Sequence, residues 1–204
     1  MKIEVQQVGM LMTNCYIVWD ENTKNAAVID PGDDGAFLAD CLKRKGLNLQ
    51  YILLTHGHFD HIGGVEELKE TCGTEPKIYI SECDMALPST FGENVQLDPK
   101  AVTFWKEGDQ VKLDSITFKV ISTPGHTPGS VCLIAEDVIF SGDTLFQGSC
   151  GRTDFPGGSW TQMAASLKRL AQLPGDYTVL SGHTGSTTLS RERKTNMFIQ
   201  SALS

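Results

Sequence analysis

Three histidines and one aspartate stand within six residues of the segment 53–64, "LLTHGHFDHIGG". The whole chain has five histidines, so this segment holds more than half of them, namely His56, His58 and His61. Imidazole and carboxylate groups are common ligands of zinc, iron and manganese. His56 and His58 can point in one direction from an extended turn, whereas Asp60 and His61 can point in another. The spacing therefore favours two neighbouring metal ions over a single one.

The two remaining histidines and a further aspartate lie in glycine-rich segments of the same kind. His126 stands in "STPGHTPGS", His183 in "VLSGHTGS" and Asp143 in "IFSGDT". Each follows an apolar run typical of a strand, and loops at strand ends often carry binding and catalytic residues. If these strand ends converge, they form one metal site in which Asp143 is the candidate bridge between two ions. The alternative, a hydrogen-bonded surface histidine, would have to hold for all five histidines.

The elements that must position these residues alternate between strand-like and helical patterns. Strand-like runs are 2–8, 14–20, 26–30, 49–55, 77–81, 111–123, 130–136, 137–143 and 177–183, and helical periodicity covers 36–46, 64–73 and 160–175. Gly46 is expected to end the first helix, and Ser159 to cap the start of the third. We find no linker or low-complexity segment. The pattern predicts one α/β domain over residues 1–204, with two β-rich halves and helices on the outer faces.

Composition limits the classes of partner. About 40% of the 204 residues are hydrophobic, enough for a core, and the net charge of −8 disfavours nucleic-acid and membrane surfaces. No apolar run approaches the roughly 18 residues of a membrane helix. The first residues lack the apolar core of a signal peptide, and the six cysteines include no C-x-x-C pair. We therefore expect a cytoplasmic protein with reduced thiols that acts on small molecules.

The segment 55–64, "THGHFDHIGG", resembles the T-H-x-H-x-D-H-x-G-G signature of the metallo-beta-lactamase superfamily. The segments "DPG", "TPGHTPGS", "FSGDTLF" and "SGH" follow in the order typical of this family, so the resemblance covers nearly the whole chain. It implies a four-layer αβ/βα sandwich, in which two mixed β-sheets carry helices on their outer faces. It also implies a dinuclear metal site along one edge of the sheets.

The same resemblance implies a role for each candidate ligand. By the family pattern the first ion is held by His56, His58 and His126, and the second by Asp60, His61 and His183, while Asp143 bridges the two ions. Asp30, in "VIDPG", matches the aspartate that orients a ligand histidine in the family. The alternative for Asp30 is an ordinary turn aspartate before Pro31.

Residues 142–159, "GDTLFQGSCGRTDFPGGS", resemble the corresponding loop of glyoxalase II and its relatives, the hydroxyacylglutathione hydrolases. The resemblance implies hydrolysis of thioesters such as S-lactoylglutathione by a metal-bridging hydroxide, with Asp60 and Asp143 as catalytic residues. Two divalent ions are expected, zinc first, with iron or manganese as alternatives. Full-length glyoxalase II has an additional helical domain that helps to hold glutathione. This shorter chain resembles the compact bacterial subgroup, so recognition of glutathione stays open.

Three basic residues are candidates for binding the carboxylates of a thiol carrier. These are Arg152 in the "GRTD" segment, and Arg191 and Lys194 near the C-terminus. Each has an alternative role, because Arg152 can pair with Asp154 and brace the loop, and Arg191 and Lys194 can lie on a solvated helix face. Cys150 has no spare histidine to activate it, so we expect a plain loop residue there.

Several other functions share this ligand set. A persulfide dioxygenase has the same fold and a similar "GRTDF" loop, but uses a single iron. A lactonase, a β-lactamase and a nuclease are further hydrolases of the superfamily. A serine hydrolase is disfavoured because no G-x-S-x-G motif is present. A non-catalytic binding protein is disfavoured because all seven ligand positions are filled. The oligomeric state is left open.

Overall fold

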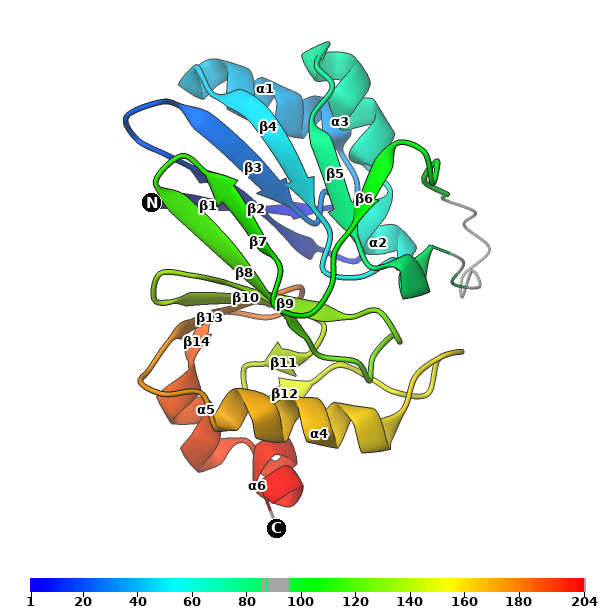
Figure 1. The fold of residues 1–204 in the computed structure, drawn as a ribbon, viewed down its shortest axis with the longest axis vertical. Coiled ribbons are helices and arrows are strands. Elements are labelled where there is room, and N and C mark those ends of the chain that lie inside the picture. Colours follow the sequence, from blue (N-terminus) through cyan, green and yellow to red (C-terminus); the bar gives the residue numbers. More distant parts are fainter. Residues whose placement is uncertain (86, 88–95, 204) are drawn as a thin grey trace.

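Residues 1–85, 87 and 96–203 are described by a computed structural model, in which two six-stranded sheets face each other (Figure 1). The first sheet has the order β1-β2-β3-β4-β5-β6. Its strands are β1 (Lys2–Val8), β2 (Thr13–Trp19), β3 (Asn25–Ile29), β4 (Asn48–Leu53), β5 (Lys77–Ile80) and β6 (Val102–Phe104). The strands from β1 to β3 are antiparallel, and those from β3 to β6 are parallel.

The second sheet has the order β14-β13-β10-β9-β8-β7. Its strands are β7 (Gln110–Leu113), β8 (Ile116–Ser122), β9 (Val131–Ala135), β10 (Val138–Gly142), β13 (Thr178–Ser181) and β14 (Thr187–Thr188). Only β10 and β13 are parallel neighbours among these strands, so this sheet is also mixed. A small hairpin, β11 (Leu145–Phe146) and β12 (Ser149–Cys150), follows β10.

Helices cover both outer faces and complete four layers (Figure 1). The helices α1 (Gly35–Lys45) and α3 (Val65–Cys72) pack on the first sheet; α4 (Trp160–Ala171), α5 (Leu189–Thr195) and α6 (Met197–Leu203) pack on the second. Apolar clusters lie beneath the helices on each outer face, and another, which includes Phe118 and Phe140, lies between the sheets. The predicted αβ/βα sandwich is confirmed. None of the described helices is long and apolar enough to cross a membrane.

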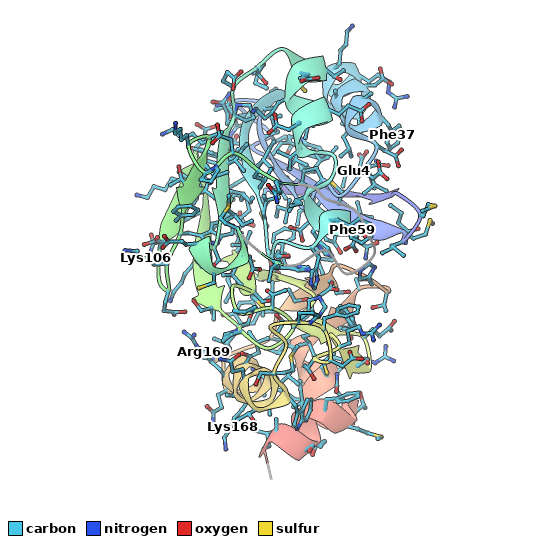
Figure 2. The ribbon with its side chains drawn as sticks, turned by 90° about the vertical axis from the view of Figure 1, so that its right-hand side faces the viewer. Glu4, Phe37, Phe59, Lys106, Lys168 and Arg169 are labelled. Carbon is cyan, nitrogen blue, oxygen red and sulfur yellow. The ribbon has the colours of Figure 1, made fainter. Side chains whose placement is uncertain are left out.

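Helix α4 illustrates how residue spacing produces these layers. Met163, Leu167 and Leu170 are buried and recur at intervals of three or four residues, so they share one face of the helix. Lys168 and Arg169 lie on the exposed side (Figure 2). As predicted, Ser159 caps the start of the helix, because its side chain accepts a hydrogen bond from the backbone N–H of Gln162. Gly46 likewise ends α1, with a φ of 65°.

The strand pattern differs from the prediction in two respects. The segment 111–123, predicted as one strand, is the hairpin of β7 and β8, which turns at Asp114 with a φ of 52°. Aspartate adopts this left-handed region more readily than most residues. The short strands β6, β11, β12 and β14 were not predicted. They have two or three residues each, which is too few to show an alternating pattern.

Candidate metal centre

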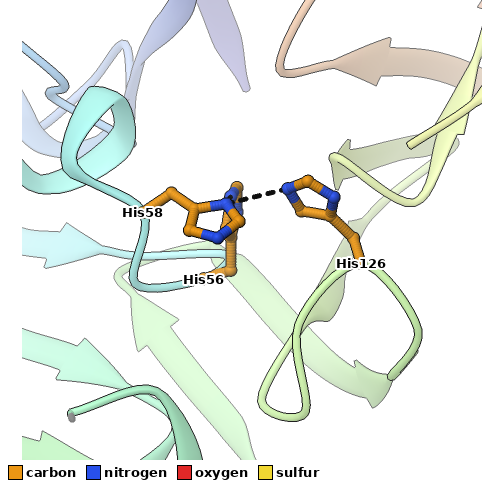
Figure 3. A group of neighbouring side chains, drawn as sticks. All are labelled: His56, His58 and His126. Atoms are coloured by element: carbon orange, nitrogen blue, oxygen red, sulfur yellow. Dashed lines mark hydrogen bonds between the residues drawn. The ribbon is translucent and has the colours of Figure 1, made fainter. Parts of the chain in front are cut away.

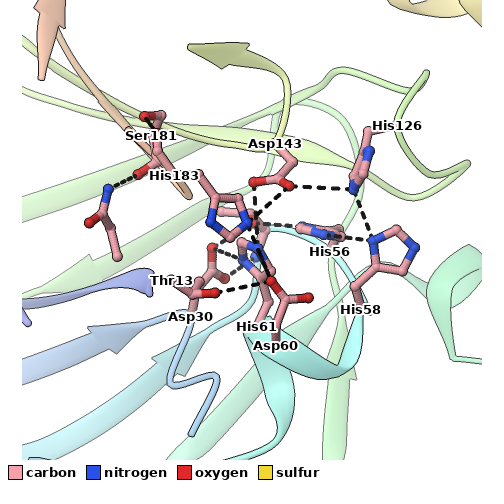
Figure 4. A network of polar contacts seen from close by, with 12 residues as sticks. Thr13, Asp30, His56, His58, Asp60, His61, His126, Asp143, Ser181 and His183 are labelled. Atoms are coloured by element: carbon pink, nitrogen blue, oxygen red, sulfur yellow. Dashed lines mark hydrogen bonds and ion pairs between the residues drawn. The ribbon is translucent and has the colours of Figure 1, made fainter. Parts of the chain in front are cut away.

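Loops that follow strands of both sheets meet at one edge of the sandwich (Figure 4). His56 and His58 follow β4, and Asp60 and His61 lie in the short helix α2 (Phe59–Ile62) that comes next. From the second sheet come His126 after β8, Asp143 after β10 and His183 after β13. The structure therefore brings all seven predicted ligand residues together, and their ligand atoms fall into overlapping groups.

The first group consists of His56, His58 and His126, all of them buried (Figure 3). The Nδ1 atom of His58 lies 3.2 Å from Nε2 of His56 and 2.9 Å from Nε2 of His126. A tetrahedral zinc ion with Zn–N bonds of about 2.0–2.1 Å separates its nitrogens by about 3.3 Å. The spacing of these three nitrogens is therefore close to that of one metal ion.

The second group consists of Asp60, His61 and His183. Asp60 Oδ2 lies 3.5 Å from Nε2 of His61 and 3.3 Å from Nε2 of His183. This mixture of one carboxylate and two imidazoles suits the same range of divalent ions as the first group.

Asp143 lies between the two groups. Its Oδ2 is 3.5 Å from Nε2 of His126 in the first group and 3.5 Å from Nε2 of His183 in the second. Its Oδ1 is 3.5 Å from Nε2 of His61. The carboxylate thus lies within 3.5 Å of nitrogens in both groups, a position compatible with the predicted bridge.

Two polar atoms in this centre are buried without a hydrogen-bond partner among the described residues: Nε2 of His61 and Oδ1 of Asp143. A buried polar atom without a partner costs roughly 1–3 kcal/mol. These two atoms face each other at 3.5 Å, and each is a metal-ligating atom. A divalent cation would satisfy both, so the donor set fits the predicted metal site.

Two hydrogen bonds from outside the ligand set orient histidine rings. Asp30 Oδ2 lies 3.0 Å from Nδ1 of His61, and the Asp30 carboxylate also accepts hydrogen bonds from the backbone N–H and the hydroxyl of Thr55. The backbone carbonyl of Arg152 accepts a hydrogen bond from Nδ1 of His126 at 2.7 Å. Both rings therefore turn Nε2 towards the centre. Asp30 occupies the place that the resemblance implies for it.

The electrostatic environments of the two groups are opposite. Burial, reinforced by the neighbouring histidines, lowers the pKa of His56 well below its usual range and that of His58 to about 3. Burial would also lower the pKa of His61, but the charges of Asp143, Asp30 and Asp60 outweigh it and raise that pKa to about 10. Without metal, His56 and His58 are therefore neutral at pH 7, whereas His61 holds a proton.

A pocket of about 510 Å³ opens onto the ligand residues. Its other walls include Leu11, Phe146, Cys150, Arg152 and Phe155. Burial raises the pKa of the Cys150 thiol to about 11, so this residue is a protonated wall residue at neutral pH.

Arg152 stands at the wall of this pocket, as a substrate-binding role requires. Its guanidinium donates hydrogen bonds of 2.7 and 2.6 Å to the carboxylate of Asp154, so the predicted pair with Asp154 also forms. The guanidinium carbon lies 3.9 Å from the ring centroid of Phe155, which places the charge over the aromatic face. The two predicted roles of Arg152 are therefore compatible in geometry.

The structure does not bring the other two basic candidates to the pocket. Arg191 and Lys194 are exposed on α5 and are absent from the described residues that line it. Between them, Arg193 donates hydrogen bonds to three backbone carbonyls at the end of α4, those of Ala171, Leu173 and Gly175. The geometry favours the alternative reading of this basic segment as a solvated helix face.

Sequence reasoning missed several residues that shape the site. Thr13 donates a hydrogen bond of 3.0 Å to Asp60. Glu192 is fully buried on α5 and accepts hydrogen bonds from the backbone of Gly148 and from Asn196, whose amide also bonds the carbonyl of Ser149. Glu192 and Asn196 thereby hold the hairpin that carries the pocket wall. Their spacing of four residues, which places them on one helix face, was the available signal.

The sequence also matches a known protein family and known relatives. The family model described as the metallo-beta-lactamase superfamily matches residues 8–183. The chain belongs to this superfamily. It is 38% identical to hydroxyacylglutathione hydrolase GloC from Haemophilus influenzae, over 98% of this chain and 99% of the relative.

Two solved structures are also similar to this chain over nearly their full length. The B3 metallo-beta-lactamase BLEG-1 has a TM-score of 0.88 and 36% identity, covering 97% of this chain and 99% of that one. TTHA1623, solved in a di-iron-bound form, has a TM-score of 0.82 and 35% identity, covering 96% and 99%. Superfamily membership and the cluster of histidines and aspartates together indicate a metal-dependent hydrolase that binds divalent ions.

Proposed function

We propose that this chain hydrolyses thioesters of a small thiol carrier, with S-lactoylglutathione as the first substrate to test. The relative GloC, similar over almost the whole chain, supports this choice. The products are a hydroxy acid and a free thiol, because the C–S bond breaks while a C–O bond forms to the oxygen of water. The observation that carries the proposal is the absence of a general acid among the described residues of the pocket.

Outside the seven ligand residues, the titratable residues described in the pocket are Cys150 and Arg152. Arg152 stays protonated beside Asp154, which raises its pKa, and Cys150 holds its proton to about pH 11. No spare carboxylic acid or imidazolium is therefore available there to protonate a leaving group. A thiolate, whose conjugate thiol has a pKa of about 8.5, leaves without such help, whereas an alkoxide or amide nitrogen needs it.

The two ligand groups supply the remaining chemistry. Divalent ions bound there would lower the pKa of a bound water towards about 7 and polarise the thioester carbonyl. Asp143 is the proposed shared ligand and Asp60 a ligand of the second ion, which makes both carboxylates catalytic. Asp30 and the Arg152 carbonyl keep Nε2 of His61 and His126 facing the reacting centre. Phe146 and Phe155 add aromatic surface to the wall of the pocket. We propose zinc for both groups, with iron or manganese as alternatives.

The test is release of free thiol from S-lactoylglutathione by the purified protein, loaded in turn with zinc, iron and manganese. We expect a kcat/KM of about 10⁵ M⁻¹ s⁻¹ or more with at least one metal, which lies within the range of working enzymes. Parallel assays use a lactone, a β-lactam and glutathione persulfide. Negligible thioester cleavage by the metal-loaded protein, together with turnover of a lactone or β-lactam or with oxygen uptake on the persulfide, would overturn the proposal.

A further inference from the structure

A buried carboxylate outside the ligand set joins the two loops that carry the first group. Asp84 is the last residue of the short 3-10 helix η1 (Glu82–Asp84), and 3% of it is exposed. Its Oδ2 accepts hydrogen bonds from the backbone N–H of Gly57 at 3.0 Å and from the hydroxyl of Thr127 at 2.7 Å. Its Oδ1 accepts one from the backbone N–H of Gly129 at 2.7 Å.

These contacts connect the two sheets. Gly57 lies between His56 and His58, in the loop that follows β4 of the first sheet, whereas Thr127 comes directly after His126, in the loop that follows β8 of the second. The hydrogen-bond distance of 2.9 Å between Nδ1 of His58 and Nε2 of His126 crosses the same junction. Asp84 thus binds both loops immediately beside the residues whose separation defines the first group.

Asp84 packs so closely against Gly57 and Gly129 that a side chain at either position would collide with it. A Cβ atom on Gly129 would lie 2.5 Å from Oδ1 of Asp84, and one on Gly57 would lie 2.5 Å from the Asp84 backbone oxygen. Glycine at these two positions lets both backbones approach closely enough to donate their hydrogen bonds. Two of the three hydrogen bonds to the carboxylate therefore come from the backbone of closely packed glycines, and the third comes from the side chain of Thr127.

We propose that Asp84 is a positioning residue that sets the separation of His58 and His126 and thereby the affinity of the first group for its ion. Across this junction Nδ1 of His58 and Nε2 of His126 lie 2.9 Å apart, so any separation of the two loops would widen the spacing of the first group's nitrogens. Hydrogen bonds to a carboxylate are roughly twice as strong as neutral ones and oppose this separation. The inference rests on metal binding in the proposed function, but not on thioester chemistry.

The decisive variant is Asp84→Asn, which keeps the size of the side chain but replaces one acceptor oxygen with a donor amide. At least one of the three donors then faces another donor. We expect the first group to bind Co²⁺ 10- to 100-fold more weakly, the range typical of partners outside the ligand set, and the second group to change less than threefold. Titration of the metal-free protein with Co²⁺ measures this, because paramagnetically shifted imidazole N–H signals in NMR spectra distinguish His56, His58 and His126 from His61 and His183.

Matched variants separate positioning from folding. Thr127→Val removes one hydrogen bond to Asp84 and should lower the Co²⁺ affinity of the first group, as Asp84→Asn does. Thr127→Ser keeps the hydroxyl and should have the wild-type affinity. Asp20 is a comparison residue that directly follows β2, at the end of this strand away from Thr13 and the metal centre. Its carboxylate is also 3% exposed and also accepts backbone hydrogen bonds, from Asn22 and Thr23. Asp20→Asn should lower the melting temperature without changing the affinity of either group.

Two outcomes would overturn the proposal. One is wild-type affinity of the first group in Asp84→Asn and Thr127→Val, whatever their melting temperatures. The other is an equal loss of affinity in both groups, which indicates a general structural defect. If Asp84→Asn does not fold, Thr127→Val alone decides. Metal titration needs no substrate, so its result is independent of whether the protein cleaves thioesters.

Discussion

The two ligand groups lie side by side and offer similar atoms, yet they are prepared for a cation in opposite ways. The first group has three buried histidines and no carboxylate, and the pKa of His56 and of His58 lies far below the usual value. The second group contains Asp60 and has Asp30 behind His61, whose pKa is raised to about 10. In the first group His56 and His58 are therefore neutral at pH 7, and a metal ion need not displace a proton from their ligand nitrogens. In the second group a metal ion has to displace the proton that His61 holds next to the carboxylates.

The largest effect is expected where the two groups meet. Asp143→Ala removes the carboxylate that lies 3.5 Å from nitrogens of both groups. We expect kcat/KM for the thioester to fall by more than the roughly 10- to 100-fold typical of residues outside the ligand set, and the protein to retain at most one metal ion. Elemental analysis and kinetics check this. Two tightly bound ions and full activity in the variant would show that the groups do not share this ligand.

A smaller and one-sided effect is expected from Asp30→Asn. The substitution weakens the hydrogen bond that orients His61, so the second group should lose about 10- to 100-fold in affinity. The first group should change less, because Asp30 bonds His61 directly but reaches His56 indirectly, through the Thr55 hydroxyl and through the His61 ring. Titration with Co²⁺ gives both affinities. Asp30→Asn is thus the counterpart of Asp84→Asn, and equal losses in both groups would contradict the separation of the two.

The contrast between the groups also shows what the sequence could reveal. The ligand residues were predictable because four of them lie in one short segment and the others follow apolar strand-like runs. Asp84 was not predictable from such patterns, because its partners Gly57 and Thr127 are 27 and 43 residues away. Which loops meet is decided by the order of strands in two sheets, and hydrophobic periodicity does not determine that order.

The same limit explains the other differences. Long strands and amphipathic helices such as α4 were predicted, since burial of one face leaves a periodic signal. The short strands β6 and β14 complete sheet edges through backbone pairing, which leaves little trace in residue type. Arg191 and Lys194 have the right charge for a substrate carboxylate, but the direction in which α5 points them depends on packing of Leu189 and Glu192. Charge alone did not reveal that direction.

The metal-free protein should lose stability at both ends of the pH range, because histidines of the centre have pKa values shifted in opposite directions. His58 has a folded-state pKa of about 3, so between pH 6.5 and 3 the unfolded chain binds a proton that the folded protein does not, and stability falls as the pH is lowered. His61 has a folded-state pKa of about 10, so its stabilisation is complete below pH 6.5 and is lost as the pH rises to 10. Melting temperatures after chelation, from pH 4 to 10, test both limbs.

Single variants assign the limbs of that profile. His58→Ala should make the acid limb less steep, with the contribution of His56 remaining, and leave the alkaline limb unchanged. His61→Ala should reduce the alkaline limb, with the contribution of His183 remaining, and leave the acid limb unchanged. A profile in which either variant flattens both limbs would show that the two groups titrate as one unit. Bound zinc should suppress both limbs, because ligand binding to the folded state stabilises it.

The smallest effect concerns the pocket wall beside the first group. Arg152→Ala removes the guanidinium but keeps the backbone carbonyl that orients His126. We expect KM for a thioester with a carboxylate on its thiol carrier to rise about two- to fivefold, as for an exposed ion pair, with kcat and metal content unchanged. Arg191→Ala, which removes a similar charge from outside the pocket, should change KM less than twofold. A fall in metal affinity in Arg152→Ala would instead mean that Arg152 and Asp154 brace the loop of the first group, so that substrate binding and metal binding are not separable on that side of the centre.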